Sequence, residues 1–130
     1  FKVNGIPFSG YVDLVDQHRA VRDLKTSKRK PSGTDYALNM IGYAIGFRKA
    51  TGETESSVAL DYMVRTKKPY HHLVQSDGPV PDAAVDRFAS VVEKVATGVK
   101  KGVFIPNGLN NNACSWCGYK SICSDYKETR

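Results

Sequence analysis

Residues 10–27 read GYVDLVDQHRAVRDLKTS and contain the pattern that decides the fold. β-Branched and aromatic residues predict one strand over residues 9–16 and another over residues 18–26, with a tight turn near Gln17. If the two strands pair as a hairpin, Asp13 and Asp23 come side by side. Asp23 and Lys25 are two residues apart, so both side chains face the same side of the pleat.

Turn and periodicity signals on either side of this segment predict the other elements. Asn4-Gly5 predicts a hairpin within residues 2–8, and Pro31 and Gly33 predict a loop over residues 28–33. The remaining predictions are a helix from Thr34 or Asp35 to Gly52, strands over residues 56–66 and 70–75, a helix from Pro81 closed by residues 98–102, and a short helix over residues 119–127. This order indicates an α/β fold with a mixed central sheet, because it contains both hairpins and a helical crossover.

The composition is that of one globular domain. The chain has 130 residues, 41% hydrophobic and 25% charged. No apolar run reaches the roughly 18 residues of a membrane span, and no signal peptide opens the chain, so we expect a cytoplasmic location. The sequence begins at Phe1 rather than methionine, which suggests a fragment or a processed product.

The charge balance favours a polyanionic partner. Nineteen basic and thirteen acidic side chains give a net charge of +6. Many basic proteins bind no nucleic acid, so charge alone is weak evidence. The basic side chains form two clusters, Lys25, Lys28, Arg29 and Lys30, and then Arg65, Lys67 and Lys68.

The two aspartates and the lysine fit a divalent-metal site. Apolar residues flank each aspartate, and a buried carboxylate is costly unless it is compensated. Asp13, Asp23 and the backbone carbonyl of Leu24 would offer hard oxygen ligands to Mg²⁺. Lys25 could then orient a water molecule or stabilise charge on a phosphate. The alternative is an ordinary surface charge cluster, since the D-x-K pattern often arises by chance.

Gly10-Tyr-Val-Asp13 followed by Val21-Arg-Asp23-Leu-Lys25-Thr-Ser27 resembles the core of the PD-(D/E)XK nuclease superfamily. The branch of RecB-type exonucleases, including AddB and CRISPR-associated relatives, is the most similar. This resemblance implies a restriction-endonuclease-like core over residues 1–103, a mixed sheet flanked by helices. It also implies that Asp13 and Asp23 hold Mg²⁺ or Mn²⁺ and that Lys25 is catalytic.

Two further features of that branch bear on this chain. A glutamine and, four residues later, a tyrosine occupy the helix after the lysine strand; Asn39 and Tyr43 stand at these places here, which implies a role in holding DNA. The branch also has an N-terminal helix before the first strand, often with an acidic residue or histidine that completes the metal site. Only twelve residues precede Asp13, so we expect a truncated chain that binds metal weakly or is inactive by itself.

The three cysteines lie in a tail over residues 104–130. Cys114, Cys117 and Cys123 form a C-x2-C-x5-C pattern, a poor disulfide framework and a better metal-ligand pattern. In the RecB-type branch, three such cysteines and one upstream cysteine hold a [4Fe–4S] cluster, and this chain has no upstream cysteine. The alternatives are free thiols, or zinc with a histidine drawn from His18, His71 and His72.

Two functions follow from the sequence. The first is a metal-dependent DNA exonuclease in recombination, repair, phage replication or CRISPR adaptation, with a helicase or another recombination or CRISPR protein as its expected partner. Its basic loop Lys28, Arg29 and Lys30 would grip the DNA backbone without reading sequence. The second is a catalytically inactive nuclease-like module or a zinc-dependent module that only binds nucleic acid.

Overall fold

The computed structural model describes residues 1–31, 38–103 and 113–123. The chain divides into two compact units, Phe1–Val95 and Ala96–Arg130, and each is considered by itself. Among the described residues, none of the helices combines the length and the apolar character that a membrane span requires.

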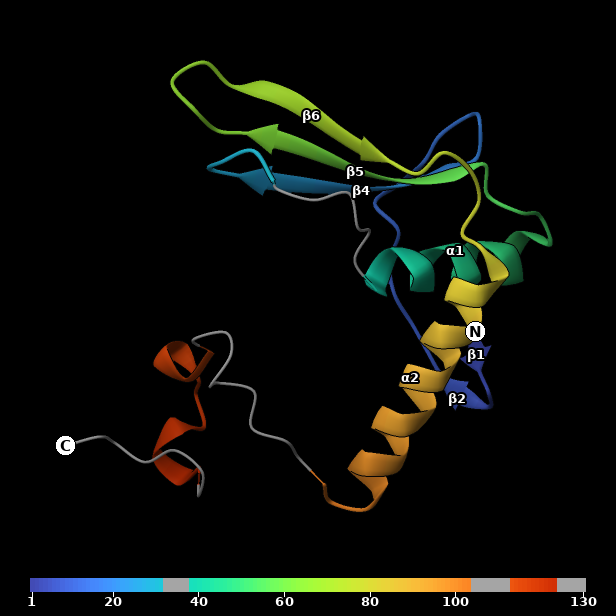
Figure 1. Cartoon of the computed structure of the whole chain (residues 1–130), viewed down its shortest axis with the longest axis vertical. Helices are drawn as coiled ribbons and strands as arrows, with labels where there is room; N and C mark the ends of the chain where they lie inside the picture. Colours follow the sequence, from blue (N-terminus) through green and yellow to red (C-terminus); the bar gives the residue numbers. More distant parts are fainter. Residues whose placement is uncertain (32–37, 104–112, 124–130) are drawn as a thin grey trace. The chain divides into compact units, whose positions relative to one another are not determined.

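A four-stranded sheet forms the upper layer of the first unit (Figure 1). Its strands stand in the order β3 (Leu14–Val15), β4 (Ala20–Ser27), β5 (Ser57–Val64) and β6 (Tyr70–Gln75). β4 and β5 are parallel, and the two outer pairings are antiparallel. The predicted mixed sheet is therefore confirmed, and β6 has the predicted bounds.

The first strand is much shorter than residues 9–16. Its ladder with β4 ends at the pair Leu14 and Arg22. Beyond that pair, the carboxylate of Asp13 accepts a hydrogen bond from the backbone N–H of Leu24 at 2.8 Å. A backbone carbonyl would use this donor in a longer antiparallel ladder, so the side chain of Asp13 takes the place of the strand.

The second strand also begins later than predicted, because a turn occupies its expected first residues. β4 starts at Ala20 rather than at residue 18, because Arg19 has a left-handed backbone with φ 64° and belongs to the turn. The Arg19 N–H bonds to the carbonyl of Asp16 at 2.9 Å, and the Asp16 carboxylate accepts from the backbone N–H groups of His18 and Ala20, both at 2.9 Å. The predicted tight turn near Gln17 is thus present.

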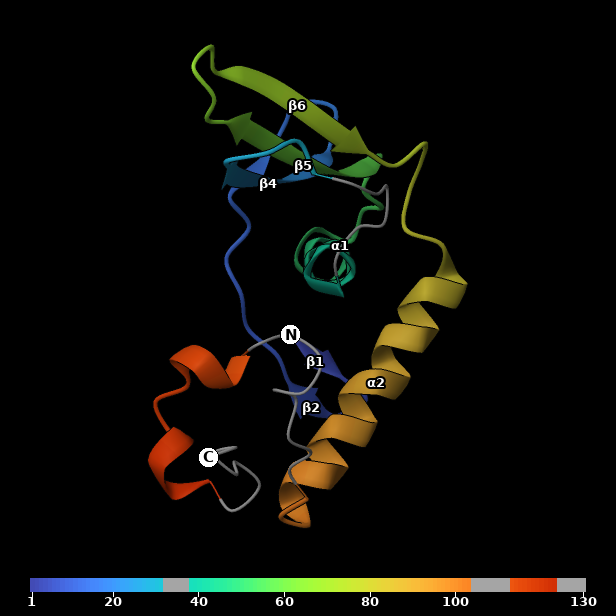
Figure 2. The same ribbon diagram turned by 60° about the vertical axis from the view of Figure 1, so that its left-hand side comes forward.

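Helix α1 (Leu38–Thr51) packs under one face of this sheet, as its end-on view in Figure 2 shows. The buried core between them contains Val21, Val58 and Leu60 from the strands and Met40 and Ala44 from the helix. The helix ends as predicted at Gly52, whose φ of 76° glycine adopts without strain. Thr34 and Asp35, the predicted start, lie outside the described residues.

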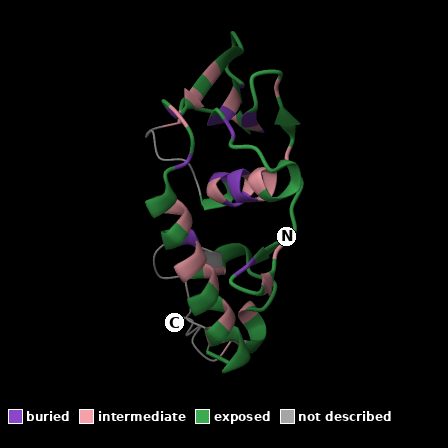
Figure 3. Cartoon of the chain, turned by 90° about the vertical axis from the view of Figure 1, so that its right-hand side faces the viewer, coloured by how far each residue is buried: buried purple, intermediate pink, exposed green. Residues whose placement is uncertain are grey.

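A small hairpin and the second helix complete this unit. β1 (Lys2–Val3) and β2 (Ile6–Pro7) are joined by Asn4 and Gly5, whose positive φ values of 47° and 77° form the predicted tight turn. A second core contains Val3, Ile45 and Phe88. Phe88 is the buried residue of α2 (Asp82–Lys100), and most of that helix is exposed or half-buried in Figure 3.

A buried ion pair ties α1 to the segments around it. Glu55 is 1% exposed, and both of its carboxylate oxygens accept hydrogen bonds from the guanidinium of Arg48, at 2.6 and 2.7 Å. The backbone N–H of Val80 donates to the same carboxylate at 2.8 Å, and Arg48 donates to the Val80 carbonyl at 2.7 Å. Burial opposes the charge on Glu55, but these hydrogen bonds prevail and hold its pKa below the usual value.

The second unit contains two short 3-10 helices, η1 (Ala113–Trp116) and η2 (Lys120–Ile122). The predicted helix over residues 119–127 is therefore shorter and of a different type in its described part. Residues 124–130 lie outside the described residues. The turn at η1 was not predicted.

Candidate active site

The loop before β3 brings Asp13 to the edge of β4. Continuing the register of Leu14 and Arg22 by one residue sets Asp13 opposite Asp23. Asp13 is exposed, and its hydrogen bond to the Leu24 N–H fixes the carboxylate at that edge. The two aspartates therefore meet although the strand expected to align them is short.

Asp23 and Lys25 form a close ion pair on the α1 side of β4. Asp23 is 3% exposed, and its Oδ2 lies 2.6 Å from Nζ of Lys25. Asp23 is the main cause of the raised pKa of Lys25; burial opposes that rise, and Tyr43 and Asp13 add to it. Asp23, Tyr43 and Asp13 thus all act electrostatically on Lys25.

The surroundings of Asp23 fit a divalent cation. Its Oδ2 is fully buried, and the Lys25 ammonium is the cation that compensates its charge. A buried carboxylate that depends on a neighbouring cation is also a natural ligand for a hard metal ion. Among the described residues, no group of three or more His, Cys, Asp or Glu side chains is gathered as a metal site. The two carboxylates alone would therefore not complete a metal site.

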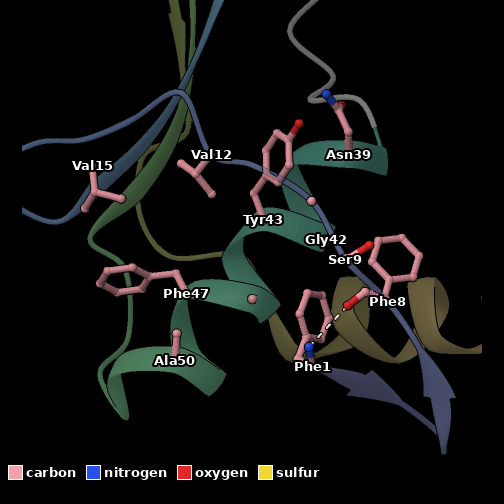
Figure 4. A pocket seen from close by; sticks show the side chains of 12 residues that line it. Phe1, Phe8, Ser9, Val12, Val15, Asn39, Gly42, Tyr43, Phe47 and Ala50 are labelled. Atoms are coloured by element: carbon pink, nitrogen blue, oxygen red, sulfur yellow. Dashed lines mark hydrogen bonds between the residues drawn. The ribbon is translucent and has the colours of Figure 1, made fainter.

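Helix α1 supplies Tyr43 and Asn39 from its first turns. The ring of Tyr43 lies against Gly10, where an added Cβ would be 3.3 Å from the ring. Asn39 is exposed one turn earlier, and both residues line the same pocket (Figure 4). Tyr43 therefore lies against the segment that leads to Asp13, and Asn39 lies one turn before it along the helix.

The two basic clusters meet at one end of the sheet. Lys28, Arg29 and Lys30 follow the end of β4, and the backbone N–H of Arg65, just after β5, bonds to the carbonyl of Ser27 at 2.7 Å. Because β4 and β5 are parallel, both chains leave the sheet at the same end, which Figure 1 shows at the tips of these strands. The basic side chains there are exposed: Lys28, Arg29, Lys30, Arg65, Lys67 and Lys68.

Arg22 and Asp61 form an ion-pair network on the other face of the sheet, and the sequence did not predict it. Two hydrogen bonds of 2.8 Å join the guanidinium of Arg22 to the carboxylate of Asp61. His71 lies 2.6 Å from the same carboxylate. Arg22 is the main cause that lowers the pKa of Asp61. Period-two alternation along β4 separates this network from Asp23 and Lys25, so it stands outside the candidate site.

The other two histidines, His18 and His72, contact residues close to them in the turn and on the adjacent strand. His18 is exposed in the turn, with its ring 3.2 Å from the amide of Gln17. The His72 ring lies 6.4 Å from the ring of Tyr62 on the adjacent strand.

The cysteines lie along the two short helices of the second unit. Cys114 is in η1, Cys117 follows it, and Cys123 follows η2. All three are free thiols; Cys117 is exposed, and the other two are half-buried. Within the described part of the chain, these three cysteines are not gathered into a group that could hold a metal ion.

Comparison with known proteins agrees with the fold. The model of one family, the PD-(D/E)XK nuclease superfamily, matches residues 1–124. Neither the search of curated proteins nor that of solved structures finds a match. The matched region contains Asp13, Asp23, Lys25 and all three cysteines, and the mixed sheet agrees with a restriction-endonuclease-like fold. The chain therefore belongs to the PD-(D/E)XK nuclease superfamily.

Proposed function

We propose that this chain is the catalytic core of a nuclease that cleaves DNA with Mg²⁺ or Mn²⁺. One observation supports this above all. The carboxylate of Asp13, fixed by the Leu24 N–H, stands beside the buried Asp23–Lys25 ion pair at the open end of a short ladder. A surface charge cluster would have no reason to bury one carboxylate to 3% exposure, because burial of a charge is costly.

Asp13, Asp23 and the Leu24 carbonyl are the proposed metal ligands. The N–H and C=O groups of a strand residue point to the same neighbouring strand, so the Leu24 carbonyl faces the edge where its N–H meets Asp13. A divalent cation held by these residues would offset charge on the scissile phosphate and would make a bound water more acidic.

Lys25 is proposed to act on the phosphate directly. Its side chain is 44% exposed, so it can reach a bound anion while it stays paired with Asp23. An ammonium aimed at the scissile phosphate stabilises the charge that builds up as the bond breaks. Tyr43, within electrostatic reach of Lys25, helps to hold that phosphate in place.

The basic loops are proposed to bind the DNA backbone. Lys25 lies near the end of β4 at which both basic loops leave the sheet. These loops are the one with Lys28, Arg29 and Lys30 and the one that begins at Arg65. Contacts with phosphates bind DNA without reading its sequence. We propose an exonuclease that acts on DNA ends in recombination, repair, phage replication or CRISPR adaptation, alongside a helicase or another such partner.

Cleavage of end-labelled DNA with and without Mg²⁺ or Mn²⁺ tests this proposal. We expect metal-dependent cleavage that falls about 100-fold or more in Asp13→Asn and Asp23→Asn. Asp86→Asn, on an exposed position of α2, makes the same chemical change away from the site and should cleave normally. A folded protein that binds DNA but does not cleave it with either metal would instead be a non-catalytic nucleic-acid-binding module.

We further propose that Cys114, Cys117 and Cys123 hold a metal centre. Their donor set is one thiolate short of the four that hold a [4Fe–4S] cluster, so a cluster needs a fourth ligand that these residues do not supply. Zinc with three thiolates and one histidine is the alternative. Iron, sulfide and zinc analysis of protein purified without oxygen distinguishes the two, and Cys117→Ser should lose the metal. Metal-free protein would contradict both.

A further inference from the structure

A pocket of about 530 Å³ opens beside α1 in the first unit. Aromatic rings form much of its wall: Phe1, Phe8, Tyr43 and Phe47. Figure 4 shows Asn39 and Tyr43 at one end of the helix and Phe47 and Ala50 at the other. Its size is in the range of sites that bind small organic molecules.

Two glycines let aromatic rings pack closely at the wall of this pocket. An added Cβ at Gly46 would lie 3.0 Å from the ring of Phe1, and one at Gly10 would lie 3.3 Å from the ring of Tyr43. Both distances are tighter than an ordinary van der Waals contact. Larger side chains here would push the rings or fill the space between them.

The pocket and the candidate active site share a wall. Tyr43 lines the pocket, and its ring lies against Gly10, three residues before Asp13. Val12, which also lines the pocket, is the residue directly before Asp13. A nucleotide with its phosphate near Asp13 therefore has this pocket as an apolar surface next to the proposed site.

The chemistry of the wall suits a nucleobase. A base has two apolar aromatic faces, which stack on aromatic side chains, and a polar edge, which hydrogen-bonds. Asn39, Ser9 and the Tyr43 hydroxyl provide polar groups among the rings, and an asparagine amide pairs well with a base edge. The basic residues at the end of β4 and β5 complement the charge of the attached backbone. Other flat apolar ligands would not need those charges.

We infer that this pocket holds one unpaired base of the substrate strand, so that the enzyme engages single-stranded DNA or a frayed end. A base within a duplex is stacked and paired, and taking it out costs free energy that an unpaired base does not require. This inference rests on the proposed function, because it takes the strand to pass Asp13 and Lys25.

Binding of single-stranded oligonucleotides to the whole chain in EDTA, where the proposed cleavage cannot occur, tests it. Each oligonucleotide carries one abasic site, moved position by position from the end. We expect one position at which the missing base weakens binding about tenfold. The fluorescent base 2-aminopurine at that position should be quenched on binding, because it stacks on the rings.

Gly46→Leu should fill the pocket and remove the difference in binding affinity between intact and abasic strands. Ala83→Leu, at an exposed position of α2, adds the same side chain elsewhere and should keep it. If Gly46→Leu does not fold, Ala50→Leu, at an exposed position on the same wall, replaces it.

Equal binding of intact and abasic strands at every position would overturn the inference, and so would an unchanged difference in folded Gly46→Leu. A cleavage assay tests the proposed function separately. Cleavage without base-dependent binding refutes only the pocket, whereas base-dependent binding without cleavage refutes only the nuclease.

Discussion

Replacing Lys25 by methionine should change cation binding and cleavage in opposite directions. The Lys25 ammonium lies 2.6 Å from Oδ2 of Asp23, so it competes with a cation for that carboxylate. Two unit charges about 4 Å apart interact by about 4 kcal/mol at an effective dielectric constant of about 20. The lysine side chain is 44% exposed, and solvent screening reduces this to about 1 kcal/mol. Cation affinity should therefore rise about fivefold.

Cleavage by Lys25→Met should nevertheless fall about 100-fold or more, because the ammonium no longer stabilises charge on the phosphate. Calorimetric titration with Mn²⁺ measures the affinity, and release of labelled nucleotides measures cleavage. Lys94→Met, exposed on α2, is the matched control and should change neither. A lower or unchanged affinity in Lys25→Met would refute the assignment of Asp23 as a ligand that Lys25 partly neutralises. Unchanged cleavage would refute the catalytic role of Lys25.

Three more predictions concern the fold and the DNA surface. Glu55→Gln should lower the free energy of unfolding by about 3–5 kcal/mol at pH 7 in urea titrations, because Arg48 loses its buried partner. Because folding lowers the pKa of Glu55, this contribution is complete above the pKa that Glu55 has in the unfolded chain, and it is lost as the pH falls through the pKa of the folded state. The unfolding free energies of wild type and variant should therefore converge in acid. A difference that stays the same at low pH would contradict this. Arg19→Gly should raise the unfolding free energy by about 1 kcal/mol by relieving the left-handed backbone at φ 64°, and a loss of stability would contradict it. Lys28→Ala and Arg65→Ala should each reduce the slope of log affinity against log salt by about 1 for DNA, and an unchanged slope would remove that residue from the binding surface.

The hydrogen bond of Asp13 links the fold to the proposed chemistry. A longer β3 would satisfy the Leu24 N–H and C=O with backbone groups of Val12 and would cover the edge of β4. Because the Asp13 side chain takes the N–H instead, the ladder stops at Leu14 and Arg22, and both aspartates stay at an open edge. In the proposed site, the shortened strand would be the feature that leaves room for a cation and a phosphate.

Local geometry allowed the sequence to predict most of the fold. Strand alternation is a property of each segment, so the shared face of Asp23 and Lys25 follows from their spacing alone. The same holds for the Asn4-Gly5 turn, the end of α1 at Gly52 and the exact span of β6. The mixed sheet followed from the order of these elements, and the family followed from the motif.

Only the tertiary structure decided what depends on contacts between distant segments. The parallel register of β4 and β5 brings the loop after Ser27 to Arg65 and so joins two basic clusters that the sequence shows apart. Nothing near Glu55 in the sequence predicts its burial, because its partners Arg48 and Val80 belong to other elements. The early end of β3 and the pocket beside Tyr43 have the same origin. Periodicity is set by the geometry of each segment, whereas these features depend on which segments the packed core holds together.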